Sequence, residues 1–290
     1  MVALCCAVLG GVVTGCDEVS PADQGSAGTP ASSTTRPTED AGPTTVDVDG
    51  RSVHVSCAGG SAEDRPVLVL MAGLADGLDK MADLQQTLSA DDRVCSYDRL
   101  GEGESDQPDG PQDLDSTGKV LGAVLDEVAG DRPVVLVGHS LGGMIAARYA
   151  PGDDRVAGLV LLDATPVTTL ADTTRLIPAS ATGPGAELRA QTLAVYAGQN
   201  PEQLVLTEAP VATAGDIPVE VVQHGKPYLT AVPEYGAALE QAWADGQRAW
   251  LALSRRGYLT TATDSGHYVY VDQPDLAVQA VRRIVAQVGA

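Results

Sequence analysis

The segment GHSLG at residues 138–142 places a serine, Ser140, between two glycines. A run of Val and Leu residues precedes it and a helix-like pattern follows, so the serine lies where a buried strand turns into a helix. So tight a turn leaves no room for a Cβ on either flank and lifts the serine oxygen above the sheet. The dipole of the following helix favours negative charge there. The pattern is typical of a nucleophile; the alternative is a plain turn with an incidental serine.

A serine hydroxyl needs a base to remove its proton. The sequence has four histidines, His54, His139, His224 and His267. His54 belongs to an expected strand far from the carboxyl ends where sites gather, and the side chain of His139 diverges from its neighbour Ser140. His267 follows the last expected strand, in a loop before the final helix. We predict that His267 is the general base and that His139 serves packing; the alternative for His267 is a structural loop histidine.

Other chemistries lack their residue patterns in this sequence. There is no Cys/His cluster with zinc spacing, no phosphate-binding glycine loop that ends in lysine, and no dinucleotide fingerprint. We therefore expect no cofactor and no metal. The net charge of −21 argues against a nucleic-acid partner, which needs a clustered basic surface. The acidity also disfavours anionic substrates at long range.

Strand-like and helix-like segments alternate from residue 46 onward, which predicts a mostly parallel sheet covered on both faces. The expected strands are 45–50, 51–57, 66–73, 92–98, 133–138, 155–163, 217–225 and 257–264, and the expected helices are 80–89, 113–129, 141–150, 186–198, 235–254 and 274–288. The first two strands meet at Asp49-Gly50, a hairpin signal. Residues 165–215 interrupt the rhythm with one helical stretch, and we expect them to form a cap over the sheet's active edge; the alternative is a long surface excursion.

Residues 1–15 are apolar, too few to span a bilayer, and they end in small residues, as a signal peptide does. The last four residues before the polar stretch, VTGC, resemble a bacterial lipobox, whose cysteine, here Cys16, is lipidated after cleavage. No Lys or Arg precedes the apolar run, and the alternative is a buried N-terminal strand. Residues 16–45 are rich in Ser, Thr, Pro, Gly and Asp and predict a flexible tether. We expect an exported protein, lipid-anchored to the outer face of the bacterial cell membrane.

The five cysteines divide into three groups under this interpretation. Cys5 and Cys6 leave with the signal peptide, and Cys16 carries lipid. Cys57 and Cys95 remain as an even pair in an oxidising compartment, which predicts a disulfide. The alternative is two buried thiols.

From about residue 46 to the C-terminus the sequence resembles the α/β-hydrolase family. The segments that carry the resemblance are GHSLGG at 138–143, SYDRLGEGESD at 96–106 and DSGHYVYVDQPDLAVQAV at 264–281. The resemblance implies an α/β-hydrolase fold with a mostly parallel eight-stranded sheet, and hydrolysis through a covalent acyl-serine. It matches His267 to the family's histidine. It also makes the strands of Cys57 and Cys95 neighbours, which suits a disulfide.

The acid that orients His267 departs from the family's usual pattern. Its usual place is the loop after strand 217–225, which here reads QHGKP and has no carboxylate until Glu234. The family's alternative place is the end of the preceding strand, where this sequence has Asp163. We predict Asp163, with Glu234 or no acid at all as alternatives. The backbone N–H groups of Leu141 and Leu74 would then form the oxyanion hole.

Together these residues predict a serine hydrolase of residues 46–290, behind a signal peptide and tether, that acts on a carboxylic ester or, second, an amide. The substrate is a small molecule, and we expect a monomer. The competing interpretation is a non-catalytic lipoprotein that keeps the scaffold and binds a ligand or partner through its cap, because a fold does not fix a function.

Overall fold

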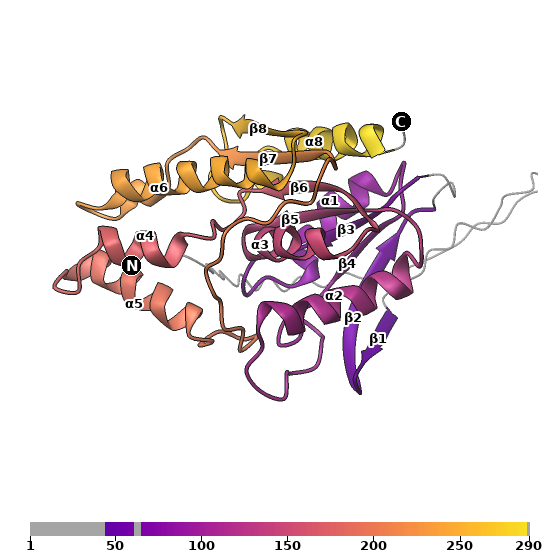
Figure 1. The fold of residues 1–290 in the computed structure, drawn as a ribbon, viewed down its shortest axis with the longest axis horizontal. Coiled ribbons are helices and arrows are strands. Elements are labelled where there is room, and N and C mark those ends of the chain that lie inside the picture. Colours follow the sequence, from indigo (N-terminus) through magenta and orange to yellow (C-terminus); the bar gives the residue numbers. More distant parts are fainter. Residues whose placement is uncertain (1–43, 61–64, 289–290) are drawn as a thin grey trace, which may run out of the picture.

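Eight strands form one sheet in this protein (Figure 1), whose computed structural model describes residues 44–60 and 65–288. The strands are β1 (Thr44–Val48), β2 (Arg51–Ala58), β3 (Val67–Met71), β4 (Val94–Tyr97), β5 (Val134–His139), β6 (Val156–Leu162), β7 (Val219–His224) and β8 (Gly257–Ala262). Their order is β1-β2-β4-β3-β5-β6-β7-β8. The pairs β1–β2 and β2–β4 are antiparallel, and all other pairs are parallel. The predicted mostly parallel, eight-stranded sheet is confirmed.

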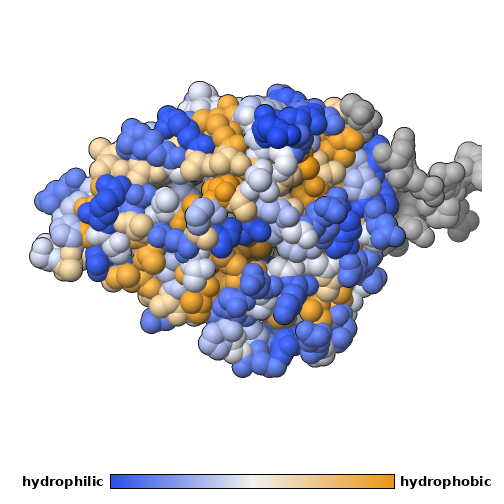
Figure 2. Space-filling view, in the orientation of Figure 1, coloured by the Kyte–Doolittle hydropathy of each residue, from blue (hydrophilic) through white to orange (hydrophobic). Residues whose placement is uncertain are grey.

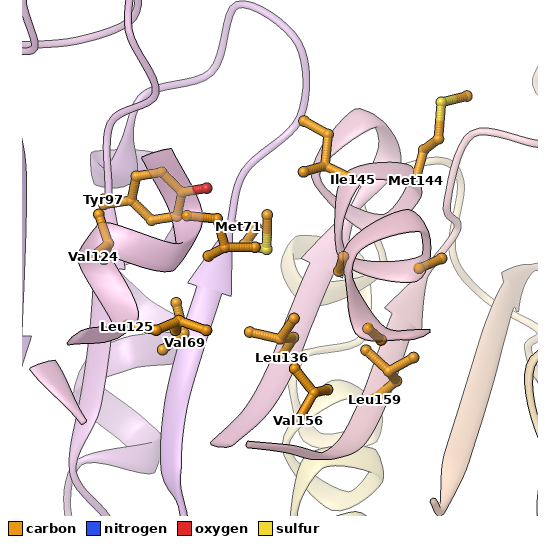
Figure 3. Packing of buried hydrophobic residues seen from close by; sticks show 14 of the residues in the cluster. Val69, Met71, Tyr97, Val124, Leu125, Leu136, Met144, Ile145, Val156 and Leu159 are labelled. Atoms are coloured by element: carbon orange, nitrogen blue, oxygen red, sulfur yellow. The ribbon is translucent and has the colours of Figure 1, made fainter. Parts of the chain in front are cut away.

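Helices cover both faces of the sheet, because its central strands are apolar on both sides. One face packs against α2 (Leu114–Val128) and α3 (Ser140–Tyr149), and the other against α1 (Ala82–Leu88) and α8 (Pro274–Val288). Figure 3 shows side chains of β3, β5 and β6 packed against the first of these layers. With Phe absent from the sequence, Val, Leu, Ile and Ala fill most of this core.

The antiparallel edge of the sheet confirms two predictions. β1 and β2 form a hairpin whose turn residues, Asp49 and Gly50, both have positive φ angles, of 53° and 81°. Cys57 of β2 lies directly opposite Cys95 of β4, and the two form a disulfide. The alternative of two free thiols is therefore wrong.

The stretch between β6 and β7 contains two helices, α4 (Thr169–Leu176) and α5 (Gly183–Tyr196), where the sequence predicted one. The missed helix, α4, reads TLADTTRL, and its three threonines have low helix propensity. Tertiary packing forms it instead, because α4 packs against α6 (Gly236–Ala249), the helix between β7 and β8. A separate apolar cluster joins this region: Ile177, Leu229, Val232, Leu239 and Trp243. That residues 165–215 act as a cap stays a prediction.

Short helices lie in several loops between the main helices and strands. Two of them, η1 and η4, occupy one end of a segment that the sequence predicted as a single helix. They are the 3-10 helices η1 (Leu78–Met81), η2 (Ala150–Gly152), η3 (Leu229–Ala231) and η4 (Trp250–Leu253) and the α-helical turn α7 (Val269–Asp272). The predicted helix 80–89 begins in η1 and continues as α1, and the predicted helix 235–254 ends in η4.

Hydrophilic residues cover much of the face seen in Figure 2, with hydrophobic groups gathered towards its middle, over the region of α3 and α5. Of the helices described, none has both the length and the apolar character that a bilayer crossing requires. The predicted signal peptide, most of the tether, and Cys16 lie outside the described residues.

Candidate active site

Ser140 is the first residue of α3 and directly follows β5. Its φ angle of +51° is rare for a residue with a side chain, so the turn holds the serine in a strained conformation. The flanking glycines permit the turn. A Cβ on Gly138 would lie 2.5 Å from the Cα of Gly143, and a Cβ on Gly142 would lie 2.4 Å from the carbonyl oxygens of Met71 and Ala72. The tight strand-to-helix turn expected from GHSLG is thus what the chain forms.

The three residues predicted as a triad meet at the carboxyl end of the sheet. The Oγ of Ser140 lies 3.0 Å from Nε2 of His267, and Nδ1 of His267 lies 2.7 Å from Oδ2 of Asp163. Asp163 follows β6 with a φ of 46°, and His267 lies in the loop between β8 and α7. The strand neighbours β5, β6, β7 and β8 therefore deliver the serine, the acid and the histidine to one point.

The geometry sets the direction of proton transfer. The Asp163 carboxylate accepts the Nδ1–H of His267, so the Nε2 lone pair of His267 faces the hydroxyl of Ser140. Asp163 is fully buried, whereas the His267 side chain is 23% exposed and can meet a substrate. Glu234, the alternative acid, is an exposed residue. This arrangement can activate a hydroxyl and stabilise the imidazolium that results.

Asp163 receives more donors than His267 alone provides. Its Oδ1 accepts hydrogen bonds from Nε1 of Trp243 at 2.9 Å and from both Nδ1 and the backbone N–H of His224. Burial alone would raise the pKa of the Asp163 carboxyl, but the hydrogen bonds and charges of His224 and His267 hold that pKa well below its usual range. The carboxyl is therefore ionised at neutral pH.

His224 was not predicted as a site residue, yet it links Asp163 to a second carboxylate. Its Nε2 lies 2.8 Å from Oε2 of Glu240 on α6, and its Nδ1 lies 2.9 Å from Asp163 Oδ1. Burial lowers the pKa of His224, but the hydrogen bonds and charges of the two carboxylates outweigh it and raise that pKa to about 9. One feature of the sequence could have pointed to His224. The loop QHGKP, where the family resemblance places the triad acid, contains this histidine and no carboxylate.

The loop that carries Leu74 is held by buried charges. Arg99 donates to the carbonyl oxygens of Ala72 and Gly73, each at 2.8 Å, and forms a buried ion pair with Glu202. The close contact of Gly142 with the end of β3 places this loop beside the first turn of α3, which begins with Ser140 and Leu141. The predicted oxyanion donors therefore belong to two adjacent segments, and their role stays a prediction.

Glu102 lies next to this cluster. Its Oε1 accepts the backbone N–H of Ala75 at 2.8 Å. Burial, reinforced by the nearby charge of Glu202, raises the pKa of Glu102 to about 7. This hydrogen bond ties the Glu102 carboxyl to the loop that carries Leu74.

The remaining two histidines, His139 and His54, have polar partners other than Ser140. The ring of His139 is 1% exposed, and its Nε2 donates to the backbone carbonyl of His267 at 3.0 Å. Burial lowers the pKa of His139 to about 3, so the ring is neutral. On the antiparallel side of the sheet, Nδ1 of His54 lies 2.9 Å from Asp98. Asp98 also accepts the backbone N–H of Leu78, which ties it to the segment after β3.

A small cavity of about 50 Å³ lies among α4, α5 and α6. Its lining is Pro166, Thr169, Asp172, Thr173, Leu188, Thr192, Leu229, Leu239, Ala242 and Trp243. Two of these residues connect it to the triad. Pro166 follows Thr165, whose Oγ1 lies 3.3 Å from Ser140 Oγ, and the indole of Trp243 bonds Asp163. Across the described ranges 44–60 and 65–288, no group of three or more side chains is arranged to bind a metal ion.

Known proteins share parts of this sequence. A family model described as alpha/beta hydrolase fold matches residues 66–188. Lipase LipV of Mycobacterium tuberculosis is 45% identical over 71 residues, which are 24% of this chain and 26% of LipV. A non-heme chloroperoxidase of Streptomyces lividans is 39% identical over 111 residues, with 32% of this chain and 39% of that protein covered. The chain thus spans well under half the length of these curated relatives.

The likeness to solved structures extends over most of the chain. The crystal structure of an enol-lactonase from Burkholderia xenovorans superposes with a TM-score of 0.59 at 19% identity, covering 84% of this chain and all of that one. A thermophilic esterase from Thermogutta terrifontis superposes with a TM-score of 0.60 at 16% identity, covering 86% of this chain and 99% of that one. At such identities the likeness concerns the fold alone.

Proposed function

This chain has the α/β-hydrolase fold, and on that premise we propose that it is a serine hydrolase that cleaves a carboxylic ester through an acyl-serine intermediate. The observation that carries the proposal is the hydrogen-bonded series Ser140–His267–Asp163. It begins at a serine strained into a positive φ at the start of a helix. Relatives named as lipases support the same chemical class.

The proposed reaction begins when Ser140 Oγ attacks the substrate carbonyl carbon while His267 Nε2 takes the hydroxyl proton. The new C–O bond forms as the carbonyl π pair moves onto oxygen. The backbone N–H groups of Leu141 and Leu74 then bind that oxyanion. The C–O bond to the alcohol breaks next, and His267 gives its proton to the departing alcohol. Asp163 holds the imidazolium in place during these steps.

Water completes the cycle by the same route. His267 removes a proton from water, the hydroxide attacks the acyl carbon, and Ser140 leaves with the proton returned by His267. The products are a carboxylic acid and the regenerated serine. An amide is the second substrate class, because the same steps apply with an amine as the leaving group.

A fluorophosphonate probe tests the nucleophile, because it reacts with activated serines and not with ordinary ones. We expect wild type to be labelled on Ser140 and the variants Ser140→Ala and His267→Ala to stay unlabelled. Ser180→Ala, which changes an exposed serine, serves as the matched control and should label like wild type. An unlabelled, folded wild type would exclude the enzyme and favour the non-catalytic binding module.

Ester turnover tests the acid. Asp163→Asn should lower kcat by roughly 10³–10⁴-fold, because the histidine then loses the partner that fixes its tautomer. Glu234→Gln should turn over esters at the wild-type rate. The opposite order would assign the acid to Glu234. Acyl esters of increasing chain length and the matching anilides, run in parallel, identify the substrate class.

A further inference from the structure

We infer that His224 and Glu240 form a second charged pair behind the triad, in which His224 carries protons on both ring nitrogens and acts as a positioning residue for Asp163. This inference rests on the proposed function for its catalytic consequence. Neither residue touches Ser140 in the contacts described, so both act through the acid.

The contacts of the ring require two protons. Nδ1 of His224 faces Asp163 Oδ1 at 2.9 Å, and Nε2 faces Glu240 Oε2 at 2.8 Å. The other oxygen of Glu240 accepts the backbone N–H of Leu229, so only Oε2 is left for the ring. An ionised carboxylate accepts and never donates, and both side chains are largely buried, at 7% and 14% exposed. A ring between two such acceptors is satisfied only as an imidazolium.

The pair fixes the orientation of the triad acid. The backbone N–H and Nδ1 of His224, together with Nε1 of Trp243, converge on Oδ1 of Asp163. Nδ1 of His224 also lies 3.0 Å from Oδ2, so it contacts both oxygens of the carboxylate, while Oδ2 faces Nδ1 of His267 at 2.7 Å. These contacts together hold the carboxylate in one orientation. Without His224, the indole would be the one side-chain donor left among these contacts to hold Oδ1.

Glu240 explains how a cation can lie so close to the triad without cancelling the acid's charge. An imidazolium beside Asp163 would alone neutralise it and weaken the stabilisation of a protonated His267. Glu240 restores the balance, because two carboxylates and one imidazolium leave a net charge of about −1 facing His267. Loss of Glu240 removes one of the two carboxylates that hold the His224 imidazolium, so it lowers the pKa of His224. It breaks no hydrogen bond between His267 and Asp163.

The surroundings of His224 let it exchange protons with solvent. Its ring nitrogens face the carboxylates of Asp163 and Glu240, and its ring packs edge-on against that of Tyr228 with centroids 4.8 Å apart. The hydroxyl of Tyr228 lies 3.5 Å from Nδ1 of His267. Lys226, two residues along the loop, is exposed. An open hollow of about 240 Å³ is lined by His224 and Glu240 and by neither Ser140 nor His267. Water therefore reaches the pair from a side other than the nucleophile.

Nuclear magnetic resonance of protein labelled with ¹⁵N-histidine reads the protonation state directly and needs no turnover. With four histidines in the sequence, His224 is assigned by the signal that His224→Gln removes. We expect both of its ring nitrogens to be protonated at pH 7 and the second proton to leave near pH 9. A singly protonated ring at pH 7 would overturn the inference, whatever the fluorophosphonate probe shows.

Kinetics then test the coupling to the triad. His224→Gln should lower kcat by about 10–100-fold with an unchanged KM, since a charge-assisted hydrogen bond is lost from the acid and none from the substrate. Glu240→Gln, of equal size, should move the alkaline fall of kcat/KM downward by about one pH unit or more. If Glu240 had a purely structural role, Glu240→Gln would lower the maximum value of kcat/KM without changing the pH at which kcat/KM falls on the alkaline side.

The matched control is His54→Gln, which breaks a histidine–carboxylate contact of the same length on the antiparallel side of the sheet. It should leave kcat and the alkaline limb unchanged. Equal losses in His54→Gln and His224→Gln, or an unmoved limb in Glu240→Gln, would contradict the inference. The proposed function fails separately, through an unlabelled wild type.

Discussion

At the scale of single residues, the site uses one residue type in three protonation environments. His139 is neutral because burial dominates and its Nε2 faces a carbonyl group. His224 is charged because two carboxylates outweigh its burial. His267 has a hydroxyl, that of Ser140, beside one ring nitrogen and a carboxylate, that of Asp163, beside the other. The partners of each ring, rather than its place in the sequence, decide its chemistry.

His139 supports His267 through the backbone, and its removal has a predictable pH signature. His139→Phe keeps a ring in the space but loses the hydrogen bond to the His267 carbonyl, so the free energy of unfolding at pH 7 should fall by about 1–2 kcal/mol. The folded-state pKa of about 3 lies below the unfolded value of 6.5. Wild type therefore loses stability through His139 as pH falls below about 6.5, and the variant does not.

Urea unfolding of both proteins at pH 7 and at pH 4 measures this effect. The deficit of His139→Phe should shrink as the pH is lowered, because only wild type must protonate a buried ring on unfolding. Ester turnover should also fall in the variant, since the His267 loop is less firmly held. A deficit that is constant between pH 7 and pH 4 would show that His139 is already charged in the folded protein.

At the scale of elements, the turn between β5 and α3 depends on a close approach of Gly142 to the end of β3. Gly142→Ala places a Cβ 2.4 Å from the backbone carbonyl oxygens of Met71 and Ala72, and neither group can move without displacing β3. We expect a loss of at least ~2 kcal/mol in the free energy of unfolding, together with loss of probe labelling, because α3 must shift away from the oxyanion loop.

Gly152→Ala is the matched control, since an added Cβ there meets no heavy atom within 4 Å. Its stability should stay within ~0.5 kcal/mol of wild type. Thermal unfolding and labelling of the two variants make the comparison. If Gly142→Ala keeps both its stability and its labelling, the first turn of α3 does not depend on this close approach.

Most of these elements were predictable, because strands buried on both faces read as continuous apolar runs and the helices between them have clear periodicity. The hairpin followed from Asp49-Gly50, and the neighbouring strands of Cys57 and Cys95 followed from the family resemblance. The helix α4 was missed because packing against α6 overrides its weak propensity.

The charged pair behind the triad was beyond sequence reasoning for a different reason. His224 and Glu240 are 16 positions apart, on β7 and α6, and no spacing rule joins a strand end to the second turn of a later helix. The sequence gives only the absence of an acid in the loop QHGKP. In place of an acid, this loop has His224, which hydrogen-bonds Asp163 at the end of the neighbouring strand β6. The two residues are brought together by the pairing of β6 with β7.

At the scale of the whole molecule, the disulfide and the acidic surface point to one setting. Cys57–Cys95 joins β2 to β4 across a separation of 38 residues, and such bonds persist in oxidising compartments. A net charge of −21 keeps the chain soluble there and disfavours anionic substrates. Both features agree with the proposal of an exported protein, and the disulfide lies wholly within the described residues.

The proposed anchor at Cys16 gives the last prediction. Lipid attached there would retain the protein in the membrane fraction, and the predicted tether of residues 16–45 would let the folded domain meet substrates in the surrounding solution. Mass spectrometry of the protein purified from its native membrane should find Cys16 at the N-terminus and carrying acyl chains. Cys16→Ala should move the protein from the membrane fraction while ester turnover per molecule is unchanged, because the triad lies within the described domain. Membrane-bound protein with an unmodified Cys16 would instead assign membrane retention to another part of the chain.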